Sequence, residues 1–185
     1  MKQVLILAFL LMAFAQWFVP GKMIWGRQYV LDKGKTYKFQ TQPIDPVNPF
    51  KGRYVSLNFA SNSFRATKKH GLKYGQKVYI EPGLDSLGYA IIKSLRTSPP
   101  AGTDYIEAAV DYINDWNADS SATIYINYPF EEFFMEEFKA PKAEKIYWDT
   151  ATSHLTTYAL VKVFKGNCVL EDLYINNKPI GELLK

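Results

Sequence analysis

The sequence predicts a mainly β fold of the α+β class, with an N-terminal transmembrane helix followed by a β-rich domain. Two patterns predict it. An apolar run near the N-terminus contains one polar residue, and short segments rich in Tyr, Val and Ile then alternate with Gly, Asn and Asp. The chain has 185 residues, 48% of them hydrophobic and 16% aromatic, which is enough to bury an apolar core and corresponds to about one domain.

The N-terminal helix is predicted from an apolar run that extends from Val4 to Val19, with Gln16 as its single polar residue. Pro20 and Gly21 are expected to end it. Sixteen residues extend about 24 Å, which is less than the ~30 Å hydrocarbon core of a bilayer, and continuation to Trp25 adds about 9 Å.

Three interpretations of this segment remain open. A retained membrane anchor fits the total length of the segment and the placement of Trp17 and Trp25, which would suit an interfacial belt. A cleaved signal peptide fits Lys2 and the small residues of Ala13–Ala15. A buried core helix of a soluble protein is also consistent with so short a run. We predict the anchor.

The boundaries follow from this choice. Residues 1–25 form the membrane anchor or signal segment, with residues 4–25 in contact with the membrane, and residues 26–185 form a single β-rich domain. By the positive-inside rule, Lys22 and Arg27 after the span favour a cytoplasmic location for the β-rich domain. In contrast, a very short N-terminal segment with Lys2 before the apolar run is typical of an export signal. We predict the extracytoplasmic side of the cytoplasmic membrane.

The β-rich part is predicted from segments with high strand propensity that are separated by turn residues. A proline-rich extended connector is expected at Pro43–Phe50. The expected strands are a hairpin of Arg27–Leu31 and Lys35–Thr41 around Asp32–Gly34, a strand at Tyr54–Phe59, a hairpin of Gln76–Pro82 and Gly88–Leu95 around Gly83–Ser86, a strand at Ala122–Tyr128, and a hairpin of Tyr158–Phe164 and Cys168–Ile175 around Lys165–Asn167.

One short helix is predicted at Glu131–Ala140, because Phe134 and Phe138 are spaced i, i+4, and Pro141 marks its end. A weak internal echo also suggests two similar halves. Tyr54 and Ile124 each begin a strand that leads into an aromatic turn, and a strand–Gly–strand hairpin follows later in both cases.

Composition excludes several kinds of site. Cys168 is the single cysteine, so an intrachain disulfide framework is excluded, and one cysteine with two histidines is too few for a structural zinc cluster. We therefore predict no metal and no cofactor. Residues 1–80 carry a net charge of +11 and residues 81–185 a net charge of −7. The basic residues form no dense run and no nucleic-acid module is present, so we predict no nucleic-acid partner.

The stretch P-I-D-P-V-N-P-F-K-G-R-Y-V-S-L-N-F, Pro43–Phe59, resembles the signature of the GDYXXLXY family of bacterial membrane-anchored proteins. In that family an apolar N-terminal segment and a P-x-D-P stretch precede the motif Gly-Asp-Tyr-x-x-Leu-x-Tyr. The matching motif positions are Gly52, Tyr54 and Leu57. Arg53 replaces the family's Asp, and Phe59 replaces its last Tyr. Tyr128–Phe138 and the closing V-L-E-D-L-Y-I-N-N-K-P-I are similar to later blocks of the family.

The resemblance implies a membrane-anchored, extracytoplasmic protein to which no enzymatic activity is attached. It also implies a possible partner, since such proteins are often encoded beside a multi-spanning membrane protein. With Arg53 in place of the family's Asp, a catalytic role for the motif becomes less expected. From the residues alone, Gly52 suits a turn, Tyr54 a sheet edge, and Val55, Leu57 and Phe59 a core face, which favours a structural motif over a ligand site.

Candidate catalytic groups are few. The acidic candidates are Glu132 and Glu136, spaced i, i+4 on the predicted helix with Glu131 and Glu137 nearby, although such a run is more typical of a solvated face. His70 is expected to be exposed in a basic turn. Asp149, Ser153 and His154 are too close in sequence to be expected to converge as a triad. Cys168 is expected to be a small buried hydrophobic residue.

Two classes of function therefore remain. The first is a non-catalytic, membrane-tethered domain that binds a membrane-protein or envelope partner through its aromatic surface. The alternative is a cell-envelope hydrolase or carbohydrate-binding domain that uses Glu132 and Glu136, which requires two carboxyl groups roughly 5–10 Å apart in a cleft.

Overall fold

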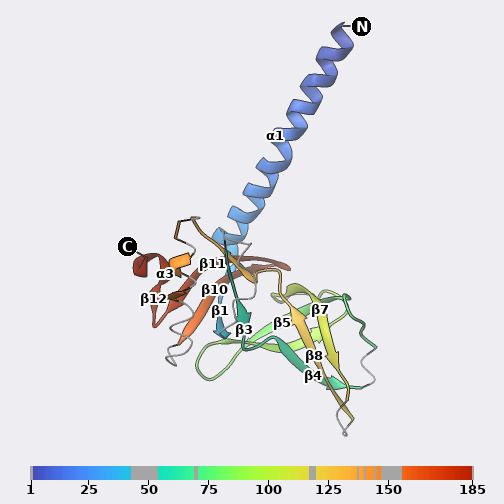
Figure 1. Ribbon diagram of the computed structural model, residues 1–185. Helices are drawn as coiled ribbons and strands as arrows, with labels where there is room; N and C mark the ends of the chain where they lie inside the picture. Colours follow the sequence, from blue (N-terminus) through green and yellow to red (C-terminus); the bar gives the residue numbers. More distant parts are fainter. Residues whose placement is uncertain are drawn as a thin grey trace.

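The computed structural model describes residues 2–42, 54–68, 71–116, 120–136, 138–139, 141–143, 145–146 and 156–184. A long N-terminal helix, α1 (Lys2–Lys33), projects from a β-rich region, and the C-terminus lies near the foot of this helix (Figure 1). The predicted order, an apolar helix followed by a mainly β region, is confirmed.

The strands form two five-stranded antiparallel sheets and one two-stranded ribbon. The first sheet has the order β12-β11-β10-β1-β3 and contains β1 (Lys35–Gln42), β3 (Asn58–Phe59), β10 (Thr157–Phe164), β11 (Asn167–Ile175) and β12 (Lys178–Pro179). The second sheet has the order β4-β8-β7-β5-β6 and contains β4 (Ser63–Thr67), β5 (Lys77–Leu84), β6 (Ala90–Arg96), β7 (Ile106–Asn114) and β8 (Ser121–Asn127). The ribbon pairs β2 (Tyr54–Ser56) with β9 (Glu132–Phe134), and a short helix, α3 (Ile180–Leu183), follows β12.

Helix α1 is longer than predicted. It continues through Pro20 and Gly21, and residues 27–31 are helical rather than a strand, so the expected hairpin with Lys35–Thr41 is wrong. A proline removes one helical hydrogen bond but need not end a helix in an apolar setting. The helix ends where the amide of Gly34 donates to the carbonyl of Val30 at 2.8 Å.

The last turns of α1 pack against the first sheet, which explains why local strand propensity is overridden there. Val30 is the one buried residue of the helix, and the ring of Tyr29 meets the ring of Phe164 edge-on at 5.4 Å. These last turns, residues 27–33, are called the foot of α1 below. In the part of α1 that precedes them the apolar side chains are exposed, and none of its most apolar 18-residue stretch is buried in the protein. The interpretation as a buried core helix is therefore wrong. The helix is long and apolar enough to cross a membrane, and a signal sequence has the same properties.

The remaining hairpins are confirmed with small shifts. The turn between β5 and β6 lies at Asp85–Gly88 instead of Gly83–Ser86, because Gly83 still pairs with Ile91 in the ladder. Asp85 fixes this turn, since its carboxylate accepts the amides of Leu87 and Tyr89 at 2.9 and 2.8 Å. Strands β4 and β7 were not predicted.

The predicted helix at Glu131–Ala140 is wrong. Residues 132–134 form β9, and helical conformation occurs only further along, at residues 141–143 and 145–146 of the described chain. The spacing of Phe134 and Phe138 misled the prediction, because both side chains are exposed, at 63% and 95%. Backbone pairing with β2, a contact distant in sequence, determines the conformation of β9 instead.

The two sheets do not correspond to two successive halves of the chain. The two hairpins that resemble each other in sequence do lie in different sheets, β5–β6 in the second and β10–β11 in the first. The first sheet, however, takes β1 and β3 from the beginning of the β-rich region and β10–β12 from its end, so the second sheet is inserted between its parts.

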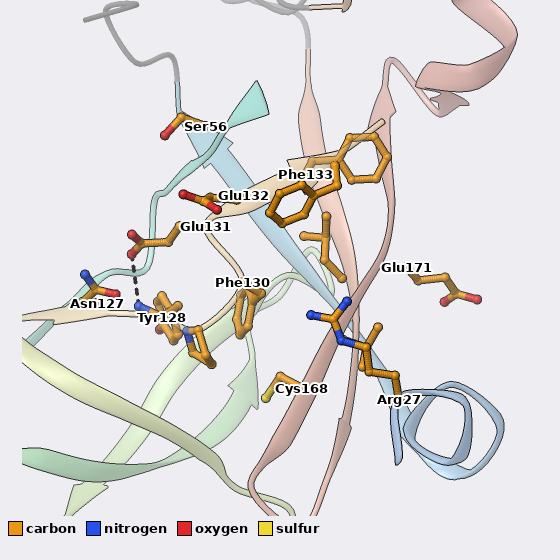
Figure 2. A pocket seen from close by; sticks show the side chains of 14 residues that line it. Arg27, Ser56, Asn127, Tyr128, Phe130, Glu131, Glu132, Phe133, Cys168 and Glu171 are labelled. Atoms are coloured by element: carbon orange, nitrogen blue, oxygen red, sulfur yellow. Dashed lines mark hydrogen bonds between the residues drawn. The ribbon is translucent and has the colours of Figure 1, made fainter. Parts of the chain in front are cut away.

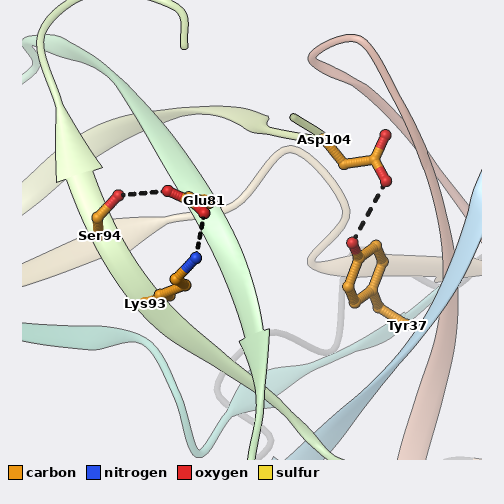
Figure 3. Close-up of polar contacts among 5 residues, drawn as sticks. All are labelled: Tyr37, Glu81, Lys93, Ser94 and Asp104. Carbon is orange, nitrogen blue, oxygen red and sulfur yellow. Dashed lines mark hydrogen bonds and ion pairs between the residues drawn. The ribbon is translucent and has the colours of Figure 1, made fainter. Parts of the chain in front are cut away.

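The sheets meet at the tip of the β10–β11 hairpin. The carbonyl of Gly166 accepts the amide of Glu107 at 3.2 Å, and the amide of Gly166 donates to the carbonyl of Tyr105 at 3.0 Å. Nearby, the hydroxyl of Tyr37 in β1 donates to Asp104, just before β7, at 3.4 Å (Figure 3). A shared core completes the junction, because buried side chains of both sheets belong to one cluster.

Candidate functional site

The structure brings together two segments that are far apart in sequence, the motif strand β2 and the acidic aromatic strand β9. Their antiparallel register places Tyr54 opposite Phe134 and Ser56 opposite Glu132. The ribbon continues where the amide of Leu57 donates to the carbonyl of Glu131 at 2.7 Å. The two segments that carry the family resemblance therefore form one structural unit.

Four aromatic rings pack beneath this unit. Phe39 of β1 and Phe59 of β3 contact the rings of Tyr128 and Phe130, with centroid distances of 5.1 to 5.7 Å. Leu57 and Phe59 are buried, with 2% and 1% of their surface exposed. This burial supports a packing role for these two motif positions.

Tyr128 and Glu131 close the turn that leads into β9. The hydroxyl of Tyr128 donates to the carbonyl of Ser61 at 2.7 Å, and burial raises the pKa of Tyr128 well above its usual value. The carboxylate of Glu131 accepts the amide of Tyr128 at 3.0 Å, and burial raises the pKa of Glu131 in spite of this bond. Glu131 therefore has a local structural role in holding the turn.

A cleft of about 760 Å³ opens between this turn, the ribbon, the beginning of β11 and the foot of α1 (Figure 2). Its wall combines aromatic and aliphatic side chains with one cation and three carboxylates. The lining residues are Arg27, Ser56, Asn127, Tyr128, Pro129, Phe130, Glu131, Glu132, Phe133, Phe134, Cys168, Val169, Leu170 and Glu171.

Arg27 and two of the carboxylates, Glu131 and Glu132, stand on different walls of the cleft, whereas the third, Glu171, lies on the side of Arg27 and forms an ion pair with Lys162 at 3.8 Å. Figure 2 shows the guanidinium of Arg27 reaching from α1 over β11, with Glu131 and Glu132 on the far side beyond Phe130 and Phe133. The sequence predicted Arg27 as a charge that follows the membrane span and as the first residue of the strand Arg27–Leu31, not as part of a site. If the helix had been predicted to continue past Trp25, its periodicity would have placed Arg27 on the last turns of α1.

The other acidic candidate, Glu136, does not line this cleft. Its carboxylate forms an ion pair with Lys139 at 2.9 Å, and 70% of its side chain is exposed. With the helix absent, Glu132 and Glu136 lose the shared face that motivated their pairing. Among the described residues, no group of three or more His, Cys, Asp or Glu side chains is arranged to hold a metal ion.

Cys168 borders the cleft at the beginning of β11. Burial raises the pKa of its thiol to about 12, and Glu107 adds to this effect. Because the thiolate is the nucleophilic form, Cys168 stays a protonated, unreactive thiol at neutral pH.

Several candidates fall outside the described part of the chain. They are Gly52, Arg53, His70, Glu137, Asp149, Ser153, His154, the connector at residues 43–50, and the side chains of Tyr54 and Val55.

A second cavity, of about 710 Å³, lies beside the junction of the two sheets. Within it Glu81 accepts hydrogen bonds from Lys93 at 2.6 Å and from Ser94 at 3.1 Å, and these bonds lower the pKa of Glu81 (Figure 3). Tyr37 and Asp104 form its other wall. The acids of this cavity are thus engaged in polar contacts between neighbouring strands and between the sheets.

A model of the GDYXXLXY protein family matches residues 16–173, which is most of the chain. The protein therefore belongs to this family, and the resemblance found in the sequence is confirmed. No curated protein and no solved structure matches the chain.

Proposed function

We propose that this member of the GDYXXLXY family is a membrane-anchored, extracytoplasmic domain of the bacterial cytoplasmic membrane. It is non-catalytic and binds a membrane protein or another envelope component. The foot of α1 carries the proposal, because the apolar helix passes without a linker into the β-rich region and packs on it through Val30 and Tyr29.

This junction determines where the β-rich region lies relative to the bilayer. From Val4 to Trp25 the helix extends about 33 Å, which matches a hydrocarbon core of ~30 Å. Val30 follows within about 8 Å of Trp25 along the helix axis. In the anchored protein that we propose, the cleft beside Arg27 would therefore lie at the level of the lipid head groups, within reach of the extramembrane loops of a neighbouring membrane protein.

The chemistry of the cleft favours binding over catalysis. Glu131 holds a backbone amide, and the thiol of Cys168 is protonated at neutral pH. The hydrolase alternative stays an untested prediction. Since Glu136 lies outside the cleft, that alternative now depends on the carboxylates that line it, Glu131, Glu132 and Glu171, the first of which is engaged with the amide of Tyr128.

Partner recovery from native membranes tests the proposal. The full-length chain, tagged at its C-terminus and expressed in its own cells, is solubilised in mild detergent, and co-purifying proteins are quantified. A four-residue Gly-Ser insertion after Lys33 uncouples the helix from β1. The same insertion in the exposed turn at Asp85–Gly88 serves as the control. We expect a specific membrane or envelope protein with the wild type and the control, and at least tenfold less of it with the insertion after Lys33.

Localisation is tested on the same cells. Protease treatment of spheroplasts, but not of intact cells, is expected to digest the β-rich region. Recovery of the chain from the cytosolic fraction, protection of the β-rich region in spheroplasts, or enrichment of no protein over an unrelated anchored chain would each contradict the proposal.

A further inference from the structure

We propose that the cavity beside the junction of the two sheets, called the junction cavity below, binds the phosphate of an anionic phospholipid from the leaflet next to the foot of α1. The inference rests on the membrane anchor of the proposed function and goes beyond it by assigning a lipid ligand to a second site. It is carried by the position of the cavity, by two lysines that lack an acidic partner, and by the charge balance of the lining side chains.

The junction cavity lies beside the foot of α1. Phe164, which lines it, meets the ring of Tyr29 in α1 edge-on at 5.4 Å. Lys35 also lines it, begins β1 directly after the end of the helix, and pairs with Val163, the neighbour of Phe164. Tyr29 lies about 6 Å beyond Trp25 along the helix axis, and the head-group layer of a bilayer is roughly 5–8 Å thick on each side. In the anchored protein, this edge of the cavity therefore lies among the lipid head groups.

Two cations at this edge have no acidic partner. Lys35 and Lys165 both line the cavity and are exposed, and within the described residues neither forms an ion pair. Each ammonium group lies over an aromatic ring instead. The Nζ atom of Lys35 is 5.2 Å from the centroid of the Tyr37 ring, and that of Lys165 is 5.3 Å from the centroid of the Phe164 ring. Cation–π contacts orient a lysine without neutralising its charge, so both ammonium groups can still attract an anion.

The acids of the junction cavity have polar contacts of their own. Glu81 is bound to Lys93 and Ser94, and Asp104 accepts the hydroxyl of Tyr37 (Figure 3). In total, three lysines face two carboxylates, which leaves one net positive charge among the lining side chains. The single negative charge of a lipid phosphodiester balances this excess.

An anionic phospholipid fits both the position and the charge of the cavity. Its phosphate contacts the two ammonium groups, and its acyl chains lie along α1, where Ile24 and Trp25 are 70% and 76% exposed. Phosphatidylcholine fits less well, because its head group carries a cation and no net charge. The rings of Tyr37 and Phe164, which could bind that cation, already hold the two lysines. We therefore expect the cavity to prefer phosphatidylglycerol.

Acetylation of lysines in the full-length wild-type chain tests the inference. The chain is kept in dodecyl maltoside micelles and treated with sulfosuccinimidyl acetate, and the rate at each lysine is read by peptide mass spectrometry. Dioleoylphosphatidylglycerol is expected to slow acetylation of Lys35 and Lys165 at least about fivefold, the factor that one lysine contributes near an anionic lipid. Lys38 is the matched control, since it lies on the same strand as Lys35 and over the ring of Tyr158 at 5.4 Å but outside the cavity. Lys33, at the end of α1 and also outside the cavity, reports diffuse attraction of the lipid and should be slowed much less.

Four results would each overturn the inference. The first is an unchanged rate at Lys35 and Lys165, and the second is equal slowing by dioleoylphosphatidylcholine. The third is equal slowing at Lys33, which would mean that the charges attract lipid without forming a site. The fourth is equal slowing by the same concentration of inorganic phosphate, which would make the cavity a site for free phosphate.

Paired variants test the same site by lipid retention. Lys35→Gln with Lys165→Gln removes both cavity cations, whereas Lys38→Gln with Lys178→Gln removes the same charge from two exposed lysines outside the cavity. Each chain is equilibrated in micelles with equal amounts of the two dioleoyl lipids and repurified, and the bound lipid is quantified by mass spectrometry. We expect at least about tenfold less phosphatidylglycerol on the cavity variant and the wild-type amount on the matched variant. Equal retention by the two variants would overturn the inference, and the acetylation test on the wild type decides it even if the cavity variant does not fold.

Failure of this inference is distinguishable from failure of the proposed function. If a membrane or envelope protein co-purifies with the full-length chain but phosphatidylglycerol does not protect Lys35 and Lys165, the binding function is retained and the lipid site is wrong. If the lipid protects both lysines but no partner is recovered, the lipid site is retained and the proposed partner is wrong.

Discussion

Replacement of Gly166 by alanine tests the junction of the two sheets. Gly166 has a φ of +89°, and a Cβ atom built on it lies 2.5 Å from Cε2 of Tyr105. The same residue forms both backbone hydrogen bonds to the beginning of β7, through Tyr105 and Glu107. The Tyr105 ring cannot move freely, since it meets the ring of Tyr79 edge-on at 5.7 Å.

The expected loss has two parts. A non-glycine residue at positive φ costs about 1 kcal/mol or slightly more. Displacement of Tyr105 weakens an aromatic contact worth roughly 0.5–1.5 kcal/mol and strains two hydrogen bonds worth roughly 0.5–1.5 kcal/mol each. We therefore expect Gly166→Ala to lower the free energy of unfolding by about 3 kcal/mol.

Gly88→Ala is the matched control, because Gly88 has a φ of +83° and no atom lies within 4 Å of the added Cβ. It should cost only the backbone part, about 1 kcal/mol. Thermal unfolding of both full-length variants in micelles, followed by near-UV circular dichroism, should place Gly166→Ala roughly 4–8 °C below Gly88→Ala, given about 2–4 °C per kcal/mol for a chain of this size. Equal transition temperatures would refute the assigned contact with Tyr105.

Three further predictions concern buried polar groups. Thr41 and Thr157 share a hydrogen bond of 2.7 Å in the core, so Thr157→Val alone should cost about 1–3 kcal/mol in urea unfolding, whereas the double valine variant should recover most of this loss. The thiol of Cys168, with its pKa raised to about 12 by burial, should react with iodoacetamide at pH 8 only after unfolding, and rapid alkylation of the native chain would contradict its assigned burial. Burial raises the pKa of Glu131 in the folded protein above its unfolded value. The stability that the protonated Glu131 carboxyl contributes is therefore complete at acidic pH, and it is lost as the pH rises through the pKa of Glu131 in the folded protein. Glu131→Gln should therefore gain stability relative to the wild type between about pH 4 and pH 7, and a gain that does not change with pH would refute this.

Hairpins and the apolar helix could be predicted because their signals are local. The turn residues between β5 and β6 and at Lys165–Asn167 specify hairpins within a few residues, and the apolar composition of α1 is continuous. Strand β7, Ile106–Asn114, was missed because its two adjacent alanines blur the alternation that identifies a strand.

Long-range contacts account for the wrong predictions. At Tyr29 and Val30, strand propensity yields to the continuity of α1 and to packing on β10 and β11. At Glu131–Phe134, helical spacing yields to pairing with β2. The cleft could not be predicted for the same reason, since Arg27, Glu132 and Cys168 come from three distant segments and meet only through the fold.

The replacement of the family's last tyrosine by Phe59 has a physical explanation in the aromatic cluster. Phe59 is 1% exposed and contacts Phe39, Tyr128 and Phe130. Because Phe59 is buried among aromatic rings, a hydroxyl at position 59 would need a buried hydrogen-bond partner or cost about 1–3 kcal/mol. A phenyl ring packs there without that requirement. Of the described motif side chains, Leu57 and Phe59 are thus packed in the core, whereas the neighbouring cleft is lined by residues that reach the surface.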